Sequence, residues 1–288
     1  FHCQHCVSFV TVLNLELLAI ASSITGATIG GTAPTDYYVY GVSGSNTVKI
    51  DPTPADVQPV LDGNAGSPTG NVELRARSEQ GGFDFTLNTS LSGAIGGKSI
   101  TLSSLTASDW TTVGTTWFNA ALTANGYGAV IGNVPIYTAA WTKFVSGNGR
   151  QRFSDPNISY VNQNEVDGVV SIGLAGHLDA TNLLFASLST SEKLLLDSLR
   201  DPSKANTPIQ ASEIVKYTYE GQTGYLYSFY ATNSGLVASD DGVSHTGNYE
   251  VTFQGTRPVP VPAGFVGIAL AGVIGGGMMK RRKLASKA

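Results

Sequence analysis

Alternating apolar and polar positions predict strands over much of the chain. Residues 37–42 are rich in Tyr and Val, and Gly30-Gly31 and Gly44-Ser45-Asn46 bound them, which is typical of a β-strand. Strand-like segments follow at 72–76, 83–87, 99–102, 169–174 and 248–253. The pattern therefore predicts a β-rich body.

Helical spacing is confined to a few segments. Apolar residues recur every three to four positions over 115–125, 135–145 and 178–200, and this period predicts helices there. A short helix is predicted at 54–61, with Pro54 near its start and Asp62-Gly63 at its end. The fold class that follows is α+β: an antiparallel β-rich body with a few central helices.

The clearest hairpin joins 213–219 to 225–231 through a predicted turn at 220–224. Alternating residues mark its two strands: Val215, Tyr217 and Tyr219, then Tyr225, Tyr227 and Phe229. If one face of the hairpin is open, Tyr217, Tyr219, Tyr225 and Tyr227 are candidates for stacking on sugars. The alternative is that one face packs against the core and the other shields it.

An uncharged apolar run at 263–279 lies between a proline spacer and four consecutive cations, Lys280, Arg281, Arg282 and Lys283. Its 17 residues would form a helix about 25 Å long, at the short end of what crosses a membrane. We therefore predict a transmembrane helix with the cations on the cytoplasmic side. A buried core helix is the alternative.

The predicted organisation has five parts along the chain. They are a degenerate signal peptide at 1–21, an extracellular α+β domain at 22–256, the proline spacer at 257–262, the transmembrane helix at 263–279 and a basic cytoplasmic tail at 280–288. Ala19-Ile20-Ala21 offers a signal-peptidase site, although Glu16 interrupts the apolar run before it and no Lys or Arg precedes that run.

The tail resembles the PEP-CTERM class of sorting signals on exported bacterial proteins. The likeness covers 257–283 and rests on Pro258, Pro260, Val261, Pro262, Lys280, Arg281, Arg282 and Lys283. The Pro-Glu-Pro of that class is here Pro260-Val261-Pro262, without a glutamate. The resemblance implies an exosortase-like sorting protease as a partner, and either cleavage of the tail or a permanent membrane anchor.

Three stretches of the body, 24–31, 152–160 and 176–180, are similar to a cyanobacterial family of exported PEP-CTERM proteins with no assigned activity. That resemblance implies a location, at the cell surface or in the extracellular matrix, and no chemistry.

Composition excludes several classes of function. Residues 22–257 hold 12 basic and 20 acidic groups and no cysteine, which argues against nucleic acid as a partner. No Gly-x-x-x-x-Gly-Lys-Ser/Thr phosphate cradle occurs, so no nucleotide cofactor is predicted. His2, Cys3, His5 and Cys6 have spacing that suits zinc, but no second pair exists and no metal site is predicted.

The residues that could carry chemistry form no complete catalytic set. Ser244 adjoins His245 and follows Asp240-Asp241, yet no Gly-x-Ser-x-Gly elbow exists and strand neighbours point to opposite faces. Glu213 has no carboxylate nearby in sequence to form a glycosidase pair. Asp62 and Glu73 match the two ends of an EF-hand loop whose inner positions fail the pattern.

We therefore predict a non-enzymatic, exported surface or matrix protein without catalytic residues, metal or cofactor. Its predicted partners are the membrane, a sorting protease and extracellular polysaccharide. The alternatives are a carbohydrate-binding or carbohydrate-cleaving secreted domain that uses the tyrosine hairpin, and a calcium-stabilised adhesion module.

Overall fold

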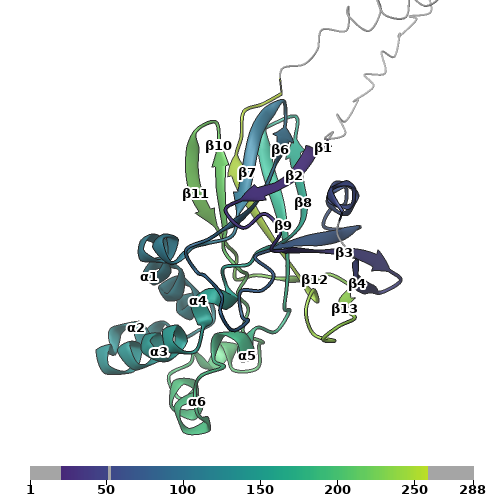
Figure 1. Cartoon of the computed structure of the whole chain (residues 1–288). Coiled ribbons are helices and arrows are strands. Elements are labelled where there is room, and N and C mark those ends of the chain that lie inside the picture. The colour runs from purple at the N-terminus through teal and green to yellow at the C-terminus, as the bar shows by residue number, and fades with distance from the viewer. Residues whose placement is uncertain (1–20, 51–52, 259–288) are drawn as a thin grey trace, which may run out of the picture.

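The computed structural model describes residues 21–50 and 53–258, which form two sheets packed face to face with a group of helices at one end (Figure 1). All strand pairs but one are antiparallel among these residues, the exception being the short parallel pair of β13 (Val237–Ala238) with β4 (Asn46–Ile50). The mixed α+β class predicted from the sequence is confirmed.

The larger sheet has nine strands in the order β12-β14-β9-β8-β5-β3-β4-β13, with β1 paired to β8. Its strands are β1 (Ala21–Ser23), β3 (Tyr37–Ser43), β4 (Asn46–Ile50), β5 (Gly70–Leu74), β8 (Asn157–Asn164), β9 (Val169–Gly176), β12 (Thr232–Asn233), β13 (Val237–Ala238) and β14 (Gly247–Gln254).

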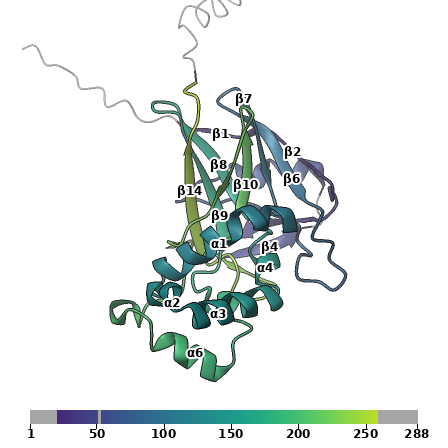
Figure 2. The same cartoon turned by 90° about the vertical axis from the view of Figure 1, so that its left-hand side faces the viewer.

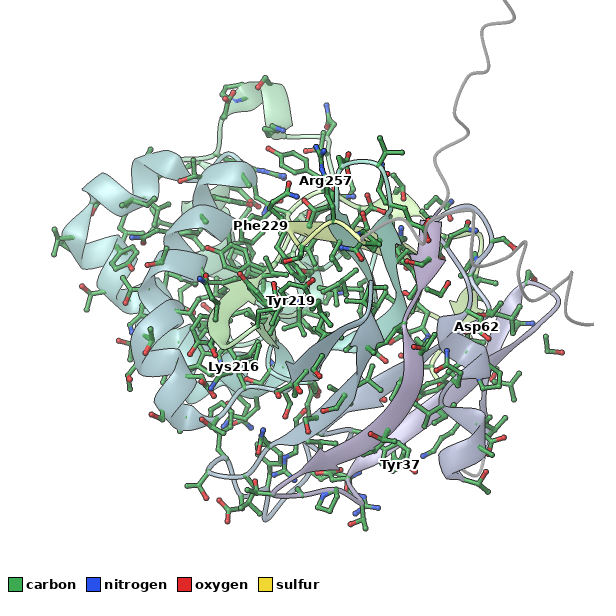
Figure 3. All side chains as sticks on the ribbon, turned by 90° about the horizontal axis from the view of Figure 1, so that it is seen from above. Tyr37, Asp62, Lys216, Tyr219, Phe229 and Arg257 are labelled. Carbon is green, nitrogen blue, oxygen red and sulfur yellow. The ribbon has the colours of Figure 1, made fainter. Side chains whose placement is uncertain are left out.

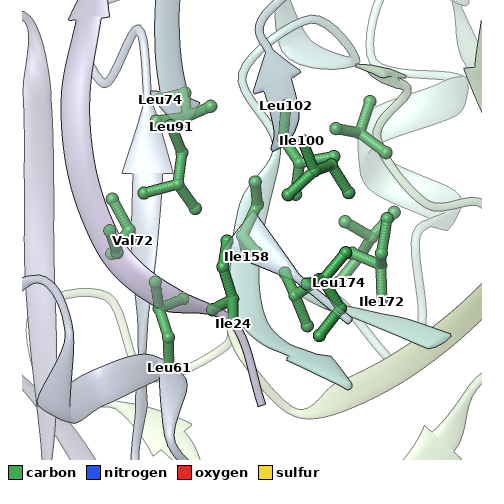
Figure 4. Close-up of a cluster of buried hydrophobic side chains, with 14 of the residues drawn as sticks. Ile24, Leu61, Val72, Leu74, Leu91, Ile100, Leu102, Ile158, Ile172 and Leu174 are labelled. Atoms are coloured by element: carbon green, nitrogen blue, oxygen red, sulfur yellow. The ribbon is translucent and has the colours of Figure 1, made fainter. Parts of the chain in front are cut away.

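The smaller sheet has five strands in the order β11-β10-β7-β6-β2. They are β2 (Thr25–Gly31), β6 (Thr89–Ile95), β7 (Lys98–Ser103), β10 (Val215–Tyr219) and β11 (Gln222–Leu226). Alternate residues of both sheets point into one aliphatic core, because side chains along a strand alternate between faces. Figure 4 shows part of this core, in which Ile24, Leu91, Ile100 and Leu102 meet Val72, Leu74, Ile158, Ile172 and Leu174.

The helices come from two insertions between strands (Figure 2). Between β7 and β8 lie α1 (Ala107–Ala124), α2 (Gly128–Gly132), α3 (Val134–Ser146) and α4 (Gly149–Arg152). Between β9 and β10 lie α5 (Thr181–Leu184), α6 (Thr190–Asp197) and the 3₁₀ turn η3 (Pro202–Lys204). Two further 3₁₀ turns, η1 (Pro54–Asp56) and η2 (Pro59–Leu61), precede β5.

Aromatic rings fill the interior of the helical part. The Trp117 side chain is fully buried, and its ring centroid lies 4.6 Å from that of Phe153 and 5.6 Å from that of Trp110. Helix α1 begins at a capping box, in which the Thr106 N–H donates to Asp109 Oδ2 at 2.9 Å. Asp109 Oδ1 also accepts from Lys216 Nζ at 2.7 Å, and this half-buried pair joins α1 to the hairpin.

Several elements lie where the sequence predicts them. The strands predicted at 37–42, 99–102, 169–174 and 248–253 are confirmed as β3, β7, β9 and β14, and the helix predicted at 135–145 is α3. The strand predicted at 83–87 is wrong, because this segment is a run of turns that covers the helical core with Phe85. The helical segment predicted at 178–200 contains two short helices, α5 and α6, and Ser189 caps the second of them.

The hairpin turn is shorter than predicted. Tyr219 pairs with Gln222, so the turn is Glu220-Gly221 alone rather than 220–224. Both residues have positive φ, 48° and 78°, as a two-residue type I′ turn requires.

None of the helices among the described residues is both long and apolar enough to cross a membrane. The transmembrane helix predicted at 263–279, the basic tail and most of the proline spacer lie outside the described residues, as does the signal peptide apart from Ala21.

Candidate ligand-binding chamber

A chamber of about 460 Å³ lies on the side of the large sheet that faces away from the aliphatic core. Val39 and Val72 point into that core, so their strand neighbours Tyr40 and Glu73 point outward into the chamber. Cross-strand partners share a face, and Asn157 of β8, which pairs with Glu73, therefore lines the same chamber.

The covering wall of the chamber is the segment 234–246, between β12 and β14. Its strand β13 pairs with β4 at the edge of the sheet, and the Ser239 N–H donates to the Thr47 carbonyl at 2.9 Å. The His245 ring, 4% exposed, has Nδ1 2.6 Å from Thr47 Oγ1 and packs edge-on against Tyr40 at 4.7 Å between centroids. These contacts fix the covering segment on the sheet.

Glu73 forms the centre of the chamber floor. Tyr40 donates its hydroxyl to Glu73 Oε2 at 3.3 Å and reaches Asp240 Oδ2 at 3.4 Å. Burial raises the pKa of Glu73 to about 8, and the charges of Asp240 and Asp36 add to the effect against the opposing Tyr40 bond and Lys49 charge. At neutral pH this carboxyl group is therefore largely protonated.

Two further carboxyl groups, those of Asp155 and Glu213, lie together beside Glu73. Burial raises the pKa of Asp155 well above its ordinary value, and the neighbouring Glu213 adds to this shift. Burial likewise raises the pKa of Glu213, although Glu213 Oε2 accepts from the Asn157 backbone N–H at 2.9 Å. The three carboxyl groups thus share one poorly solvated region.

Two side-chain oxygens near these carboxyl groups have no hydrogen-bond partner among the described residues. Ser78 donates to Asp155 Oδ2, but Asp155 Oδ1 has no partner among the described residues. Asn157 Oδ1 is likewise without a partner there. Both residues are more than nine-tenths buried and both line the chamber.

The charges around the chamber do not balance. Among the described residues, six carboxyl groups line it, those of Glu73, Glu79, Asp155, Glu213, Asp240 and Asp241. The single Lys or Arg in that lining is Arg152, whose Nε lies 3.1 Å from Glu79 Oε1. The only cation of the wall is thus engaged at its exposed rim, and the buried carboxyl groups have no cationic partner in the lining.

A serine, a histidine and an aspartate meet at another wall of the chamber, but not as a catalytic triad. Ser244 Oγ lies 3.1 Å from Nε2 of His177, which comes from after β9, and donates to Asp241 Oδ2. A triad would place the aspartate on the far nitrogen of the histidine, whereas here it takes the serine proton directly. The predicted neighbour His245 contacts Thr47 instead.

No group of three or more His, Cys, Asp and Glu side chains is placed to hold a metal ion in the part of the chain that the structure describes. In the segment that resembles an EF-hand, Asp62 Oδ1 accepts from Gln58 at 2.7 Å and Asn64 closes its own turn. Glu73, the other end of that segment, belongs to the chamber floor.

The four hairpin tyrosines divide between two faces. Tyr217 and Tyr219 lie on the side of the small sheet that faces the large sheet, where the Tyr217 ring stacks on that of Phe253 with 4.7 Å between centroids and lies close to Gly224. A hollow of about 220 Å³ beside them is lined partly by Gln222.

Tyr225 and Tyr227 pack against the helical part, and the Tyr225 hydroxyl donates to Asp109 at 2.8 Å. Viewed from above, Lys216 and Phe229 lie toward the helices, while Asp62 and Tyr37 lie on the opposite side of the molecule (Figure 3). The structure thus does not gather the four predicted stacking residues into one platform.

The sequence does not indicate the chamber, because Glu73, Asp155 and Glu213 come from segments that are far apart along the chain. Each looks like a solvated acid on its own, and Glu213 lacks a neighbour only along the chain. No family model, no curated protein and no solved structure matches this chain. The function therefore has to be inferred from the geometry and chemistry of the chamber.

Proposed function

We propose that this chain is an exported protein of the cell surface or extracellular matrix, and that its domain binds a carbohydrate in the acidic chamber without cleaving it. The observation that carries the binding function is the pair of buried, unpartnered acceptors, Asp155 Oδ1 and Asn157 Oδ1, in a chamber lined by carboxyl groups. A ligand rich in hydroxyl groups supplies the donors that these oxygens lack.

The size and mixed polarity of the chamber support a sugar. Its volume of about 460 Å³ falls within the range of about 300–1,000 Å³ of small-molecule sites. Tyr40, Gln80 and Ser244 offer further hydroxyl and amide groups around the walls. Sugar hydroxyls both donate and accept, so they suit a wall where carboxyl, amide and hydroxyl groups alternate.

Binding is favoured over hydrolysis by the charge states of the carboxyl groups. A glycosidase needs two carboxyl groups whose environments push their pKa values apart. Here the pKa values of Glu73, Asp155 and Glu213 are all shifted upward. Asp241 has a lowered pKa, despite the opposing effect of burial, through bonds from Ser244 and the Val243 N–H that occupy both of its oxygens.

The position of the chamber suits a protein displayed on a surface. The last described residues follow β14, whose Gln254 pairs with Val169 at one end of the large sheet. The chamber adjoins Asn157 and His177 at the other end, about 25 Å away along eight-residue strands. If the predicted tail holds the chain at the envelope, the chamber points away from it.

A glycan array tests the binding function. The mature protein, purified from fractionated cells, should bind one class of glycan, and Asp155→Asn should abolish that signal. Gln222→Ala, in the hollow beside the tyrosine hairpin, is the matched control and should bind like the parent. A blank array, or a signal lost in Gln222→Ala alone, would overturn the assignment to the chamber.

The intact mass of the same material tests the export part of the proposal. A mass that ends at the spacer 258–262 would support sorting with cleavage, and a mass that includes Lys280 to Lys283 would support a permanent anchor. Recovery from the cytoplasm with the first 21 residues still attached would contradict export.

A further inference from the structure

The acidic chamber contains an excess of carboxyl groups that hydroxyl donors alone do not satisfy. We propose that its ligand is an amino sugar with a free, unacetylated amine, whose ammonium group lies among Glu73, Asp155 and Glu213. This inference rests on the proposed carbohydrate-binding function and narrows it to a positively charged class of sugar.

Two buried side chains of the chamber lack a hydrogen-bond partner at one oxygen each within the described part of the chain. Asp155 is 8% exposed and Asn157 is 7% exposed, and each lines the chamber and has a side-chain oxygen without a partner among the described residues. A buried carboxylate without a cationic partner is strongly unfavourable, and an ammonium group placed beside it removes most of that penalty. An ammonium group also has three donors and no acceptor, which matches the two unpartnered oxygens of Asp155 and Asn157.

Among the described residues of the chamber wall, no Lys or Arg is placed to pair with the buried carboxyl groups. The chamber arginine, Arg152, contacts Glu79, whose side chain is 52% exposed, at the rim. The charge of Lys49 lowers the pKa of Glu73 without overcoming the effect of burial, and Lys49 does not line the chamber. A cation that pairs with these carboxyl groups in their ionised form therefore has to come with the ligand, and its charge would favour their loss of protons.

Size and spacing separate an organic cation from a bare metal ion. The carboxyl groups are spread around a space of about 460 Å³, and no three acidic or histidine side chains among the described residues are arranged to hold a metal ion. An ammonium group on a sugar ring fits this arrangement, because the ring fills the space while its hydroxyls reach Tyr40, Gln80 and Ser244.

Acetylation of the amine should abolish this recognition. An N-acetyl group replaces the charged triple donor by one N–H and adds a carbonyl acceptor and a methyl group. The carbonyl would then face the acceptors of Asp155 and Asn157 without a donor between them, which leaves buried polar atoms unpaired.

The test is calorimetric titration of the purified full-length protein with two β-1,4-linked tetrasaccharides, one of glucosamine and one of N-acetylglucosamine. We expect the glucosamine oligomer to bind at least about 100-fold more tightly, since desolvated hydrogen-bonded charge pairs contribute about 3 kcal/mol or more. Glu213→Gln and Asp155→Asn should each remove that preference. Glu165→Gln, an exposed acid in the β8–β9 turn, is the matched control and should preserve it.

The outcomes separate this inference from the function on which it rests. Equal binding of the two oligomers, or binding of neutral glycans alone, would overturn the inference and leave carbohydrate binding in place. Binding of spermidine but of no sugar would overturn both the amino sugar and the carbohydrate function. A preference that survives Glu213→Gln and Asp155→Asn in variants with unchanged circular dichroism would place the cation elsewhere and overturn the proposed site.

Discussion

The two faces of the large sheet are made by neighbouring residues of the same strands, and they have opposite chemistry. On β5, Val72 is fully buried in the aliphatic core, while the next residue, Glu73, faces the acidic chamber. On β8, Ile158 and Asn157 divide in the same way. The inner face gains stability from each side chain that it buries, whereas the outer face collects carboxyl groups whose burial is unfavourable.

The contrast indicates that stability comes from one face of these strands and the proposed binding site from the other. Proteins tolerate locally unfavourable groups at functional sites when the rest of the fold supplies enough stability. Here the favourable and unfavourable side chains alternate along one strand. Changes on the two faces should therefore have opposite effects on stability, and the following predictions use that difference.

The largest expected effect comes from the inner face. Ile172 is fully buried between the two sheets, and Ile172→Ala should leave a cavity that costs about 2–5 kcal/mol. For a domain of this size the melting temperature should fall by roughly 10 °C. Val166→Ala, at a 48% exposed position, is the control and should change it by no more than about 1 °C. A loss below 1 kcal/mol at Ile172 would mean that the aliphatic face is not the source of stability.

The second effect is a dependence of stability on pH that the outer face should produce. The folded-state pKa of Glu73 is raised from 4.5 to about 8, so the folded protein binds more protons than the unfolded chain in this range. Its contribution to stability is complete below pH 4.5 and disappears as pH rises through 8. Tyr40, Lys49, Asp240 and Asp36 are the charged or titratable groups that influence it.

The window from pH 6.5 to 8.5 separates the chamber carboxyl groups from the buried histidine, and because Asp155 and Glu213 also have raised pKa values, the variant Glu73→Gln is needed to identify the share of Glu73. His245 acts in the opposite direction, since burial lowers its pKa from 6.5 to about 4 and its stabilising effect is lost only as pH falls below 6.5. We expect the melting temperature to fall between pH 6.5 and 8.5, and Glu73→Gln to reduce the slope. Glu165→Gln should leave the slope unchanged. An unchanged slope in Glu73→Gln would contradict the charge state assigned to the chamber floor.

Glu213→Gln should change stability less than Ile172→Ala does, and it should raise it. An amide retains an acceptor for the Asn157 N–H and removes the charge that raises the pKa of Asp155. We expect stability at pH 8 to rise by about 1 kcal/mol, or about 2–4 °C in melting temperature, while ligand binding is lost. A destabilised variant would mean that the carboxylate of Glu213 has a structural partner and not a functional one.

The two faces also differ in how far the sequence predicts them. Strands such as β3 and β9 are predictable because apolar residues, β-branched residues and flanking glycines are local signals. The strand β6 escapes such prediction because its sequence, Thr-Ser-Leu-Ser-Gly-Ala-Ile, is small and polar at most positions. The predicted hairpin turn is too long because the observed register depends on Glu220 having a positive φ, which few residues other than glycine adopt.

The chamber is not predictable from local patterns, because it is a product of tertiary packing. Asp155 follows α4 and Glu213 precedes β10, and only the folded chain brings both beside Glu73. The same holds for Ser244, which meets His177 across 67 residues rather than its neighbour His245. From the sequence, His245 is the histidine that adjoins Ser244. In the structure the histidine beside Ser244 is His177, and Asp241 accepts a hydrogen bond from Ser244 itself.

The smallest expected effect concerns that group of side chains and decides between binding and catalysis. Ser244 lies in the covering segment, where its hydroxyl donates to Asp241 and contacts His177, so Ser244→Ala should cost no more than about 1 kcal/mol. The bond from Ser244 is one cause of the lowered pKa of Asp241, so the substitution should raise that pKa, which a carboxyl ¹³C titration can measure. Because the Ser244 hydroxyl donates its hydrogen bond to Asp241 and not to His177, the parent protein should not hydrolyse activated esters such as p-nitrophenyl acetate above the rate of Ser244→Ala. Faster hydrolysis by the parent would show that His177 can act as a base toward Ser244, and the chamber would then have to be reconsidered as an active site.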